Sequence, residues 1–291
     1  MRVLILGGDG MLGHQLFKHL GVNHDVRVAL RRELDAYRGL GLFKPDNSYA
    51  GIDAQDIDAL IGAAADFCPQ AIINAIGIVK QRDQAKAYMP SLEINALLPH
   101  RLALLCKAIR ARLVHMSTDC VFSGRKGAYT EADPSDAEDL YGKSKFLGEL
   151  HDEHCVTLRT SIIGLELNRK TGLIEWFLSQ KGNIKGFRRA VYTGFTTAEM
   201  ARVIERVLIK HTELHGVWHV ASTPISKYEL LCLLADKLKR TDVEIEPDDN
   251  FVCDRGLAGA RFARATGYDA PNWDTMLGEL AQQVLQRGTT T

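Results

Sequence analysis

Tyr141 and Lys145 are the two side chains whose types and spacing best suit acid–base chemistry. They lie four residues apart in YGKSK at Tyr141–Lys145, so a helix would place them one turn apart on the same face. Bringing the pKa of a phenol from about 10 to near 7 requires about 4 kcal/mol. An ammonium about 4 Å away, at an effective dielectric constant of about 20, contributes energy of that order. The pair could therefore give a proton to a carbonyl oxygen while the carbonyl group is reduced.

A second cluster of polar groups follows the apolar run Leu113–Met116, which predicts a parallel strand. Ligands bind at the carboxyl edge of such strands in open α/β sheets, and Ser117-Thr118-Asp119 would lie there. The Thr118 hydroxyl could donate a hydrogen bond to a substrate oxygen as negative charge builds on it. A Tyr-x-x-x-Lys pair alone is often only a solvated helix face. With these hydroxyls and the glycine loop described next, the catalytic interpretation is favoured.

The segment GGDGMLG at Gly7–Gly13 has the composition of a dinucleotide-binding loop. It lies between the strand-like run Val3–Leu6 and the helical stretch Met11–Leu20, which is the context that such a loop requires. Glycines allow a tight turn, close approach to a pyrophosphate and close helix–sheet packing, and the helix N-terminus offers free N–H groups. We therefore predict that the cofactor contacts Gly7, Gly10, Met11, Leu12 and Gly13.

Arg31 and Arg32 follow the second strand-like run, Val26–Leu30, at the position that usually separates NAD from NADP. A carboxylate there would accept from the ribose 2′-OH, whereas an arginine would hold a 2′-phosphate. Because the arginines precede Glu33, we expect NADPH, with NADH used at a lower preference. The alternative is a solvated basic turn in which Glu33 binds the ribose.

These residues need a sheet that brings them to one edge. Strand-like runs alternate with helical stretches in the first part of the chain, which predicts a doubly wound parallel α/β sheet of the Rossmann type. The further strands are expected at Ala71–Ala75 and Val156–Leu158, and the further helices at Asp56–Phe67 and Leu92–Arg110. After about residue 160 the pattern changes to helices with few strands. We expect an NADP-binding Rossmann domain at residues 1–160 and a mainly substrate-binding part at residues 161–291, with some segments returning to the sheet.

Composition and charge exclude several classes of function. Lys plus Arg (36) equals Asp plus Glu (36), so no overall field attracts nucleic acid or an anionic membrane. The six cysteines form no CxxC pair, so we expect no metal cluster and reduced thiols typical of the cytoplasm. No segment approaches the ~20 apolar residues of a membrane span, and the N-terminal apolar run is too short for a signal peptide. We expect a cytoplasmic protein; the oligomeric state stays open, with a homodimer as one alternative.

The chain resembles the extended short-chain dehydrogenases, and within them the dTDP-4-dehydrorhamnose reductase family. The resemblance covers nearly the whole chain and is carried by GGDGMLG, YGKSK, STDCVFSG at Ser117–Gly124 and LRTSIIG at Leu158–Gly164. It implies NADPH-dependent reduction of the keto group of a nucleotide-linked sugar. It also implies that Thr118, Tyr141 and Lys145 form the catalytic trio, and that Lys145 bonds the nicotinamide ribose.

The resemblance assigns further residues around the cofactor and the substrate. Asp53, followed by Ala54, matches the position that contacts adenine, and the strand end that lines the cofactor corresponds to Asn74, Ala75 and Gly77. Asn95 matches a helix asparagine near the active site, and Arg159 matches a strand-end arginine. For Arg189 and Arg255, a clamp on the substrate diphosphate and a plain surface position both stay open.

Departures from the family pattern fall on the substrate side. Cys120 replaces a common aromatic residue, 136–140 replaces Pro-Leu-Asn, and 253–257 replaces a segment with an Arg-Pro pair. A dTDP-linked and a UDP-linked 4-keto sugar are therefore both open as substrates. The alternatives are an epimerase or dehydratase of the same fold, or a non-catalytic NADP-binding module, since the family also resembles the regulatory subunit of a methionine adenosyltransferase.

Overall fold

The computed structural model describes residues 1–79, 87–168 and 170–289. Within these residues the chain forms two compact units whose segments alternate along the sequence. Unit 1 comprises Met1–Ser117, Asp139–Leu158 and Ala201–Val217, and unit 2 comprises Thr118–Glu138, Arg159–Met200 and Trp218–Thr291. The boundary expected near residue 160 is one of several points at which the chain passes from one unit to the other.

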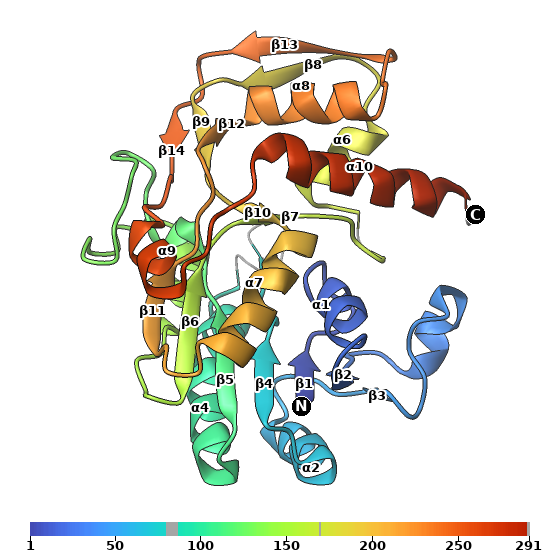
Figure 1. The fold of residues 1–291 in the computed structure, drawn as a ribbon, viewed down its shortest axis with the longest axis vertical. Coiled ribbons are helices and arrows are strands. Elements are labelled where there is room, and N and C mark those ends of the chain that lie inside the picture. The colour runs from blue at the N-terminus through green and yellow to red at the C-terminus, as the bar shows by residue number, and fades with distance from the viewer. Residues whose placement is uncertain (80–86, 169, 290–291) are drawn as a thin grey trace. The chain divides into compact units, whose positions relative to one another are not determined.

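A seven-stranded, mostly parallel sheet dominates the described residues, in the order β11-β6-β5-β4-β1-β2-β3 (Figure 1). Its strands are β1 (Arg2–Leu6), β2 (Asp25–Ala29), β3 (Ser48–Tyr49), β4 (Ala71–Asn74), β5 (Arg112–Met116), β6 (Cys155–Arg159) and β11 (Gly216–His219). Strand β1 pairs in parallel with both β2 and β4. The strand order therefore reverses between β1 and β4, and such a reversal is where open α/β sheets bind ligands at their carboxyl edge. The doubly wound parallel fold predicted from the sequence is confirmed.

Helices cover the sheet because its strands are apolar on both faces. Leu4 and Leu6 of β1 pack with α2 and α4 in one core cluster, while Val3 and Ile5, which point the other way, are equally buried. The helices whose residues lie wholly or mainly in unit 1 are α1 (Gly13–Leu20), η1 (Leu34–Leu40), α2 (Ile57–Phe67), α3 (Tyr88–Ser91), η3 (Leu92–Leu97), α4 (Leu98–Ile109), α5 (Leu140–Leu147) and α7 (Thr197–Lys210). The helix expected over Leu92–Arg110 begins as a π-helix, η3, and continues as α4.

Unit 2 contains more strands than the sequence pattern predicts. The strands are β7 (Ile162–Ile163), β8 (Gly182–Phe187), β9 (Ala190–Tyr192), β10 (Phe195–Thr196), β12 (Ile225–Ser226), β13 (Val243–Asp248) and β14 (Cys253–Asp254). Most are two or three residues long, and β13 pairs with β8 with much of its length exposed, so neither kind gives a strong apolar run. The helices are η4 (Asp119–Val121), α6 (Leu173–Ser179), α8 (Lys227–Lys237), α9 (Ala260–Thr266) and α10 (Trp273–Thr289). In the part of the chain that the structure describes, no helix has the length and apolarity needed to cross a bilayer.

Candidate active site

The glycine-rich loop leads from β1 into α1, and its backbone conformation leaves no room for side chains at several of its glycines. Gly7 has φ +84°, a left-handed conformation that favours glycine. A Cβ on Gly13 would overlap the carbonyl oxygen of Gly7, and a Cβ on Gly8 would lie 2.5 Å from the Cβ of Val28. The residue before α1 is the apolar Leu12, so no side chain caps the N–H groups that open the helix. This cradle fits the pyrophosphate of a dinucleotide held at a helix N-terminus.

The turn after β2 brings together two residues that the sequence assigned to the adenosine half of the cofactor. Arg31 Nη2 lies 3.5 Å from Asp53 Oδ2, and both side chains are about half exposed. An ion pair this exposed contributes little stability, so Arg31 can exchange the carboxylate for a phosphate. Glu33 has turned toward Gly51, whose N–H donates to the carbonyl oxygen of Arg32. Next to Asp53, Ala54 packs against the core of unit 1.

Asn74 ends β4 and fixes the chain that leaves the sheet. Its Oδ1 accepts from the N–H of Ile76 at 3.1 Å, and its Nδ2 lies 3.1 Å from Nδ1 of His115 on β5. Burial lowers the pKa of His115 well below its ordinary value, so the imidazole is neutral and Nδ1 accepts. The other ring nitrogen has no hydrogen-bond partner among the described residues. Ala75 and Gly77, the expected cofactor-lining positions, belong to the segment that Asn74 orients.

Asn95 lies in the π-helix η3 and is fully buried. Its amide accepts from the N–H of Ile78 at 2.9 Å and donates to the carbonyl oxygen of Ile78 at 3.0 Å and to Ser144 Oγ at 3.2 Å. These bonds tie the chain that follows β4 to α5. The amide is thus engaged inside unit 1, and a contact between Asn95 and substrate stays a prediction.

Helix α5 carries the predicted acid–base pair. Asp139 caps the helix by accepting from the N–H of Gly142 at 2.8 Å. Lys145 is 4% exposed, and its Nζ donates to the carbonyl oxygen of Met116, at the end of β5, at 2.6 Å. Burial lowers the pKa of Lys145 to about 8, against the opposing charge of Glu149. Tyr141, one turn earlier, is half-buried.

Thr118 belongs to unit 2, where its hydroxyl opens the short helix η4. Thr118 Oγ1 accepts from the N–H of Cys120 at 3.1 Å and donates to Asp119 Oδ1 at 3.2 Å. Burial raises the pKa of Asp119, and the positive charge of Arg255 acts in the opposite direction. Arg255 also donates from Nε to the carbonyl oxygen of Phe122 at 2.8 Å. Since Tyr141 and Lys145 lie in unit 1, the grouping of Thr118 with them stays a prediction.

The other arginines differ in their surroundings. Arg189 is exposed between β8 and β9, so its role as a phosphate clamp stays a prediction. Arg159 is buried, lies 5.2 Å from the Phe122 ring centroid and contacts His219 Nε2 at 3.1 Å. Nδ1 of His219 in turn lies 3.0 Å from the carbonyl oxygen of Tyr129. Arg159 and His219 therefore form a packed structural pair inside unit 2.

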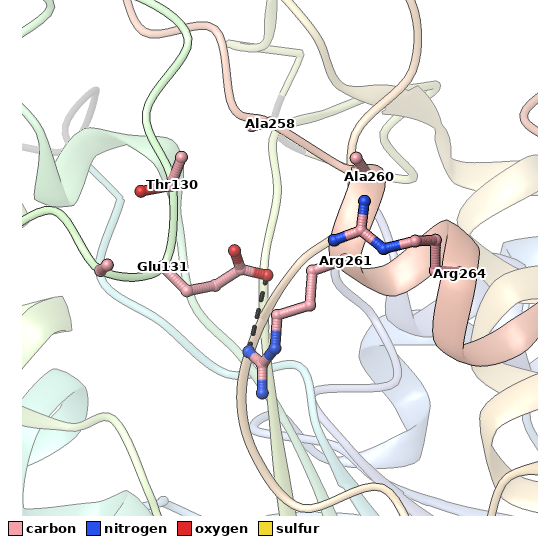
Figure 2. A pocket seen from close by; sticks show the side chains of 7 residues that line it. Thr130, Glu131, Ala258, Ala260, Arg261 and Arg264 are labelled. Carbon is pink, nitrogen blue, oxygen red and sulfur yellow. Dashed lines mark ion pairs between the residues drawn. The ribbon is translucent and has the colours of Figure 1, made fainter.

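An open pocket of about 470 Å³ lies within unit 2 and is lined by Thr130, Glu131, Ala132, Ala258, Ala260, Arg261 and Arg264. Figure 2 shows Glu131 and Arg261 pointing toward each other, and the two charged groups are 3.6 Å apart. Arg261 also lies 3.7 Å from the Trp218 ring centroid. None of the predicted catalytic or cofactor residues lines this pocket. Among the described residues, no group of three or more His, Cys, Asp or Glu side chains could hold a metal ion.

Sequence reasoning missed four residues that support the site. Asp139 caps α5, Glu149 accepts from Ser117 Oγ at 2.7 Å and faces Lys145, and His115 holds Asn74. Tyr37 bonds to the glycine loop. The four-residue spacing from Lys145 could have pointed to Glu149, although α5 ends at Leu147 and Glu149 lies just beyond it. The others depend on contacts between distant segments.

Comparisons with known proteins place this geometry in a family. The model of the RmlD substrate binding domain matches residues 1–282. Methionine adenosyltransferase 2 subunit beta of Danio rerio is 28% identical over 255 residues, 81% of this chain and 73% of that protein. The dTDP-4-dehydrorhamnose reductase of Aggregatibacter actinomycetemcomitans is 27% identical over 248 residues, 81% of this chain and 79% of that protein. The structure of dTDP-4-dehydrorhamnose reductase from Bacillus anthracis in complex with NADP superposes with a TM-score of 0.77 at 22% identity, covering 97% of this chain and 99% of the other. The family resemblance is thereby confirmed, and this protein belongs to the RmlD substrate binding domain family.

Proposed function

We propose that this protein is an NADPH-dependent reductase that converts the keto group of a nucleotide-linked 4-keto-deoxysugar to an alcohol. The substrate is dTDP-4-dehydrorhamnose or a related UDP-linked 4-keto sugar. The observation that carries the proposal is the buried ammonium of Lys145, held at the end of β5 one helical turn from Tyr141. Burying a lysine is costly, and an ammonium fixed one helical turn from a phenol is suited to carbonyl reduction. The relative named dTDP-4-dehydrorhamnose reductase supports the substrate class.

Binding of the cofactor is assigned to unit 1. The cradle at Gly7–Gly13 would hold the pyrophosphate, Arg31 and Arg32 the 2′-phosphate, and Asp53 the adenine. When bound, NADPH supplies the hydride. Asn74 fixes the chain at Ala75 and Ile76, which would line the cofactor site, by accepting from the Ile76 N–H.

Proton transfer is assigned to Tyr141. Its hydroxyl gives its proton to the keto oxygen as that oxygen becomes an alkoxide, and the Lys145 ammonium stabilises the phenolate that remains. One N–H of the Lys145 ammonium donates to the carbonyl oxygen of Met116, and the other two would donate to Tyr141 and the ribose hydroxyls. Thr118 donates a hydrogen bond to the same keto oxygen. Arg189 and Arg255 are proposed to hold the diphosphate of the sugar nucleotide.

The pKa of Lys145 predicts how activity depends on pH. Lys145 acts in its protonated form, and burial lowers the pKa of Lys145 in the free enzyme to about 8. Below that pH the Lys145 ammonium is present, and above it Lys145 loses its proton and no longer stabilises a phenolate at Tyr141. We expect kcat/KM for keto-sugar reduction, which reports the free enzyme, to fall as pH rises above about 8. A kcat/KM that stays level or rises between about pH 8 and 10 would contradict this assignment.

Arg31 and Arg32 predict the cofactor preference. A guanidinium can meet two oxygens of the 2′-phosphate, and each charge-assisted bond contributes about 1.5–3 kcal/mol. One engaged arginine should therefore favour NADPH over NADH about ten- to a hundred-fold in kcat/KM. We expect the double variant Arg31→Ala, Arg32→Ala to lose activity with NADPH selectively, while activity with NADH stays nearly constant.

Arg38→Ala is the matched control, because Arg38 lies on η1 with its side chain 79% exposed and forms an ion pair with the nearby Asp35. It should leave both cofactors unaffected. Equal losses with NADPH and NADH in the double variant, or a wild type that prefers NADH, would identify the arginines as a solvated turn.

A second candidate function is a non-catalytic NADP-binding regulatory subunit. The observation that favours it is the similarity to methionine adenosyltransferase 2 subunit beta. Such a subunit has no need of the buried lysine and the tyrosine one turn before it, and this chain has both. A regulatory subunit would change the kinetics of a methionine adenosyltransferase catalytic subunit and consume no NADPH with any keto sugar. An epimerase or dehydratase is less well supported, since dehydratases commonly have a second acid where this chain has Cys120.

A further inference from the structure

Tyr37 joins the glycine-rich loop to the turn that carries Arg31 and Arg32. It lies in η1 and is 1% exposed. Its hydroxyl donates to Asp9 Oδ2 at 3.0 Å and accepts from the backbone N–H of Arg32 at 3.2 Å. Asp9 stands between two glycines of the loop. One buried hydroxyl therefore connects the segment proposed to hold the pyrophosphate with the segment proposed to hold the 2′-phosphate.

The position of the Tyr37 ring is set by packing as well as by these bonds. The ring meets Phe43 edge-on, with centroids 5.4 Å apart, and Phe43 in turn lies 5.9 Å from the ring of Phe17 on α1. Burial, together with the negative charge of Asp9, raises the pKa of Tyr37 to about 12. The hydroxyl therefore keeps its proton at neutral pH and remains a donor to Asp9. A phenylalanine at this position would keep the packing and remove only the two hydrogen bonds.

We propose that Tyr37 is a positioning residue that selects the adenosine 2′-phosphate of NADP(H) over the 2′-hydroxyl of NAD(H). It acts through two groups. By accepting from the Arg32 N–H it fixes the backbone from which both arginine side chains extend. By donating to Asp9 it occupies a carboxylate that stands in an anion-binding loop. This inference rests on the proposed use of NADPH and adds the residue that enforces it.

The selectivity follows from what the carboxylate of Asp9 would do without its donor. An unoccupied carboxylate seeks a hydrogen bond, and the ribose 2′-OH of NAD can provide one. A 2′-phosphate cannot, because it carries close to two negative charges and repels the carboxylate. Loss of the Tyr37 hydroxyl should therefore weaken the binding of NADP⁺ and leave that of NAD⁺ unchanged or improved. A hydroxyl that only stabilised the fold would weaken both alike.

The test is calorimetric measurement of Kd for NADP⁺ and NAD⁺ in the wild type and in Tyr37→Phe. We expect the variant to bind NADP⁺ about tenfold more weakly, the worth of one charge-dependent hydrogen bond, with no loss for NAD⁺. Tyr49→Phe is the matched control. Tyr49 lies on β3, and its hydroxyl also has two polar partners, Arg27 and Asp66, neither of which belongs to the proposed cofactor site. It should leave the ratio of the two Kd values unchanged.

The double variant Asp9→Asn, Tyr37→Phe separates an effect of the Asp9 charge on cofactor binding from an effect of Tyr37 on the stability of the fold. In the Asp9→Asn background the repulsive charge is absent, so Tyr37→Phe should reduce the affinity for NADP⁺ clearly less than it does in the wild type. The role of Tyr37 would be overturned if Tyr37→Phe weakened the binding of NADP⁺ and NAD⁺ equally. It would also be overturned if Tyr37→Phe caused the same loss of NADP⁺ affinity with Asp9 as with Asp9→Asn. A wild type without preference for NADP⁺ would overturn both this role and the proposed use of NADPH. A wild type that prefers NADP⁺, with a variant that keeps that preference, would overturn only the role of Tyr37.

Discussion

Tyr141→Phe is expected to lower kcat for reduction of the keto sugar by about 10²–10⁴-fold, the usual contribution of a positioned acid. The substitution removes the proton that the developing alkoxide needs and leaves the ring in place on α5. The affinities for NADPH and for the sugar nucleotide should change little, since the hydroxyl acts mainly in the transition state. Steady-state kinetics, with Kd for NADP⁺ measured in parallel, would show this separation between turnover and binding.

The same substitution at Tyr49 is a control for the loss of a tyrosine hydroxyl elsewhere in unit 1. The bonds of that hydroxyl to Arg27 and Asp66 stabilise the region around β3 and are not proposed to touch substrate. Tyr49→Phe should therefore retain normal kcat. A Tyr141→Phe variant with near-normal turnover on the true substrate would rule out Tyr141 as the proton donor.

Lys145→Met is expected to reduce both turnover and cofactor affinity. The ammonium is proposed to lower the pKa of Tyr141 and to bond the nicotinamide ribose, so one substitution removes both interactions. We expect kcat to fall by about 10²-fold or more, since without the charge the phenol is a poor acid at neutral pH. Kd for NADP⁺ should rise about tenfold, the worth of a charge-assisted hydrogen bond to the ribose.

Lys143→Met provides the matched control on the same helix. Lys143 is exposed on α5, two residues before the buried Lys145, and loss of its charge changes the net charge of the protein equally. Turnover and NADP⁺ affinity should both stay at the wild-type level. A Lys145→Met variant that binds NADP⁺ normally would show that Lys145 does not bond the ribose. A variant that also turns over normally would show that Lys145 has no role in proton transfer.

The parallel sheet could be predicted because its strands carry strong local signals. Leu4 and Ile5 of β1, like Ile72 and Ile73 of β4, are buried on opposite faces, and a continuous apolar run is the expected pattern for such strands. The strands of unit 2 gave no such signal. β13 alternates Val243 and Ile245 with exposed glutamates, and its partner β8 is distant in sequence, so only the folded chain shows the pairing.

The candidate site was predictable where it rests on short motifs. Tyr141 and Lys145 share a helical face by spacing alone, and the glycines of the phosphate loop stand between a strand-like run and a helical stretch. The supporting contacts were not predictable, because each joins segments far apart in sequence. Asn74 on β4 contacts His115 on the neighbouring strand β5, and Tyr37 reaches Asp9 from an irregular 3₁₀-helix that has no apolar periodicity.

The most direct test of the account is the consumption of NADPH, followed by its absorbance, in the presence of dTDP-4-dehydrorhamnose and of UDP-linked 4-keto sugars. The purified chain alone, with Tyr141→Phe as the blank, should oxidise NADPH in proportion to the alcohol formed with at least one of these sugars. NADP⁺ binding without consumption of NADPH on any nucleotide-linked 4-keto sugar would contradict the assignment as a reductase and would support the regulatory subunit instead.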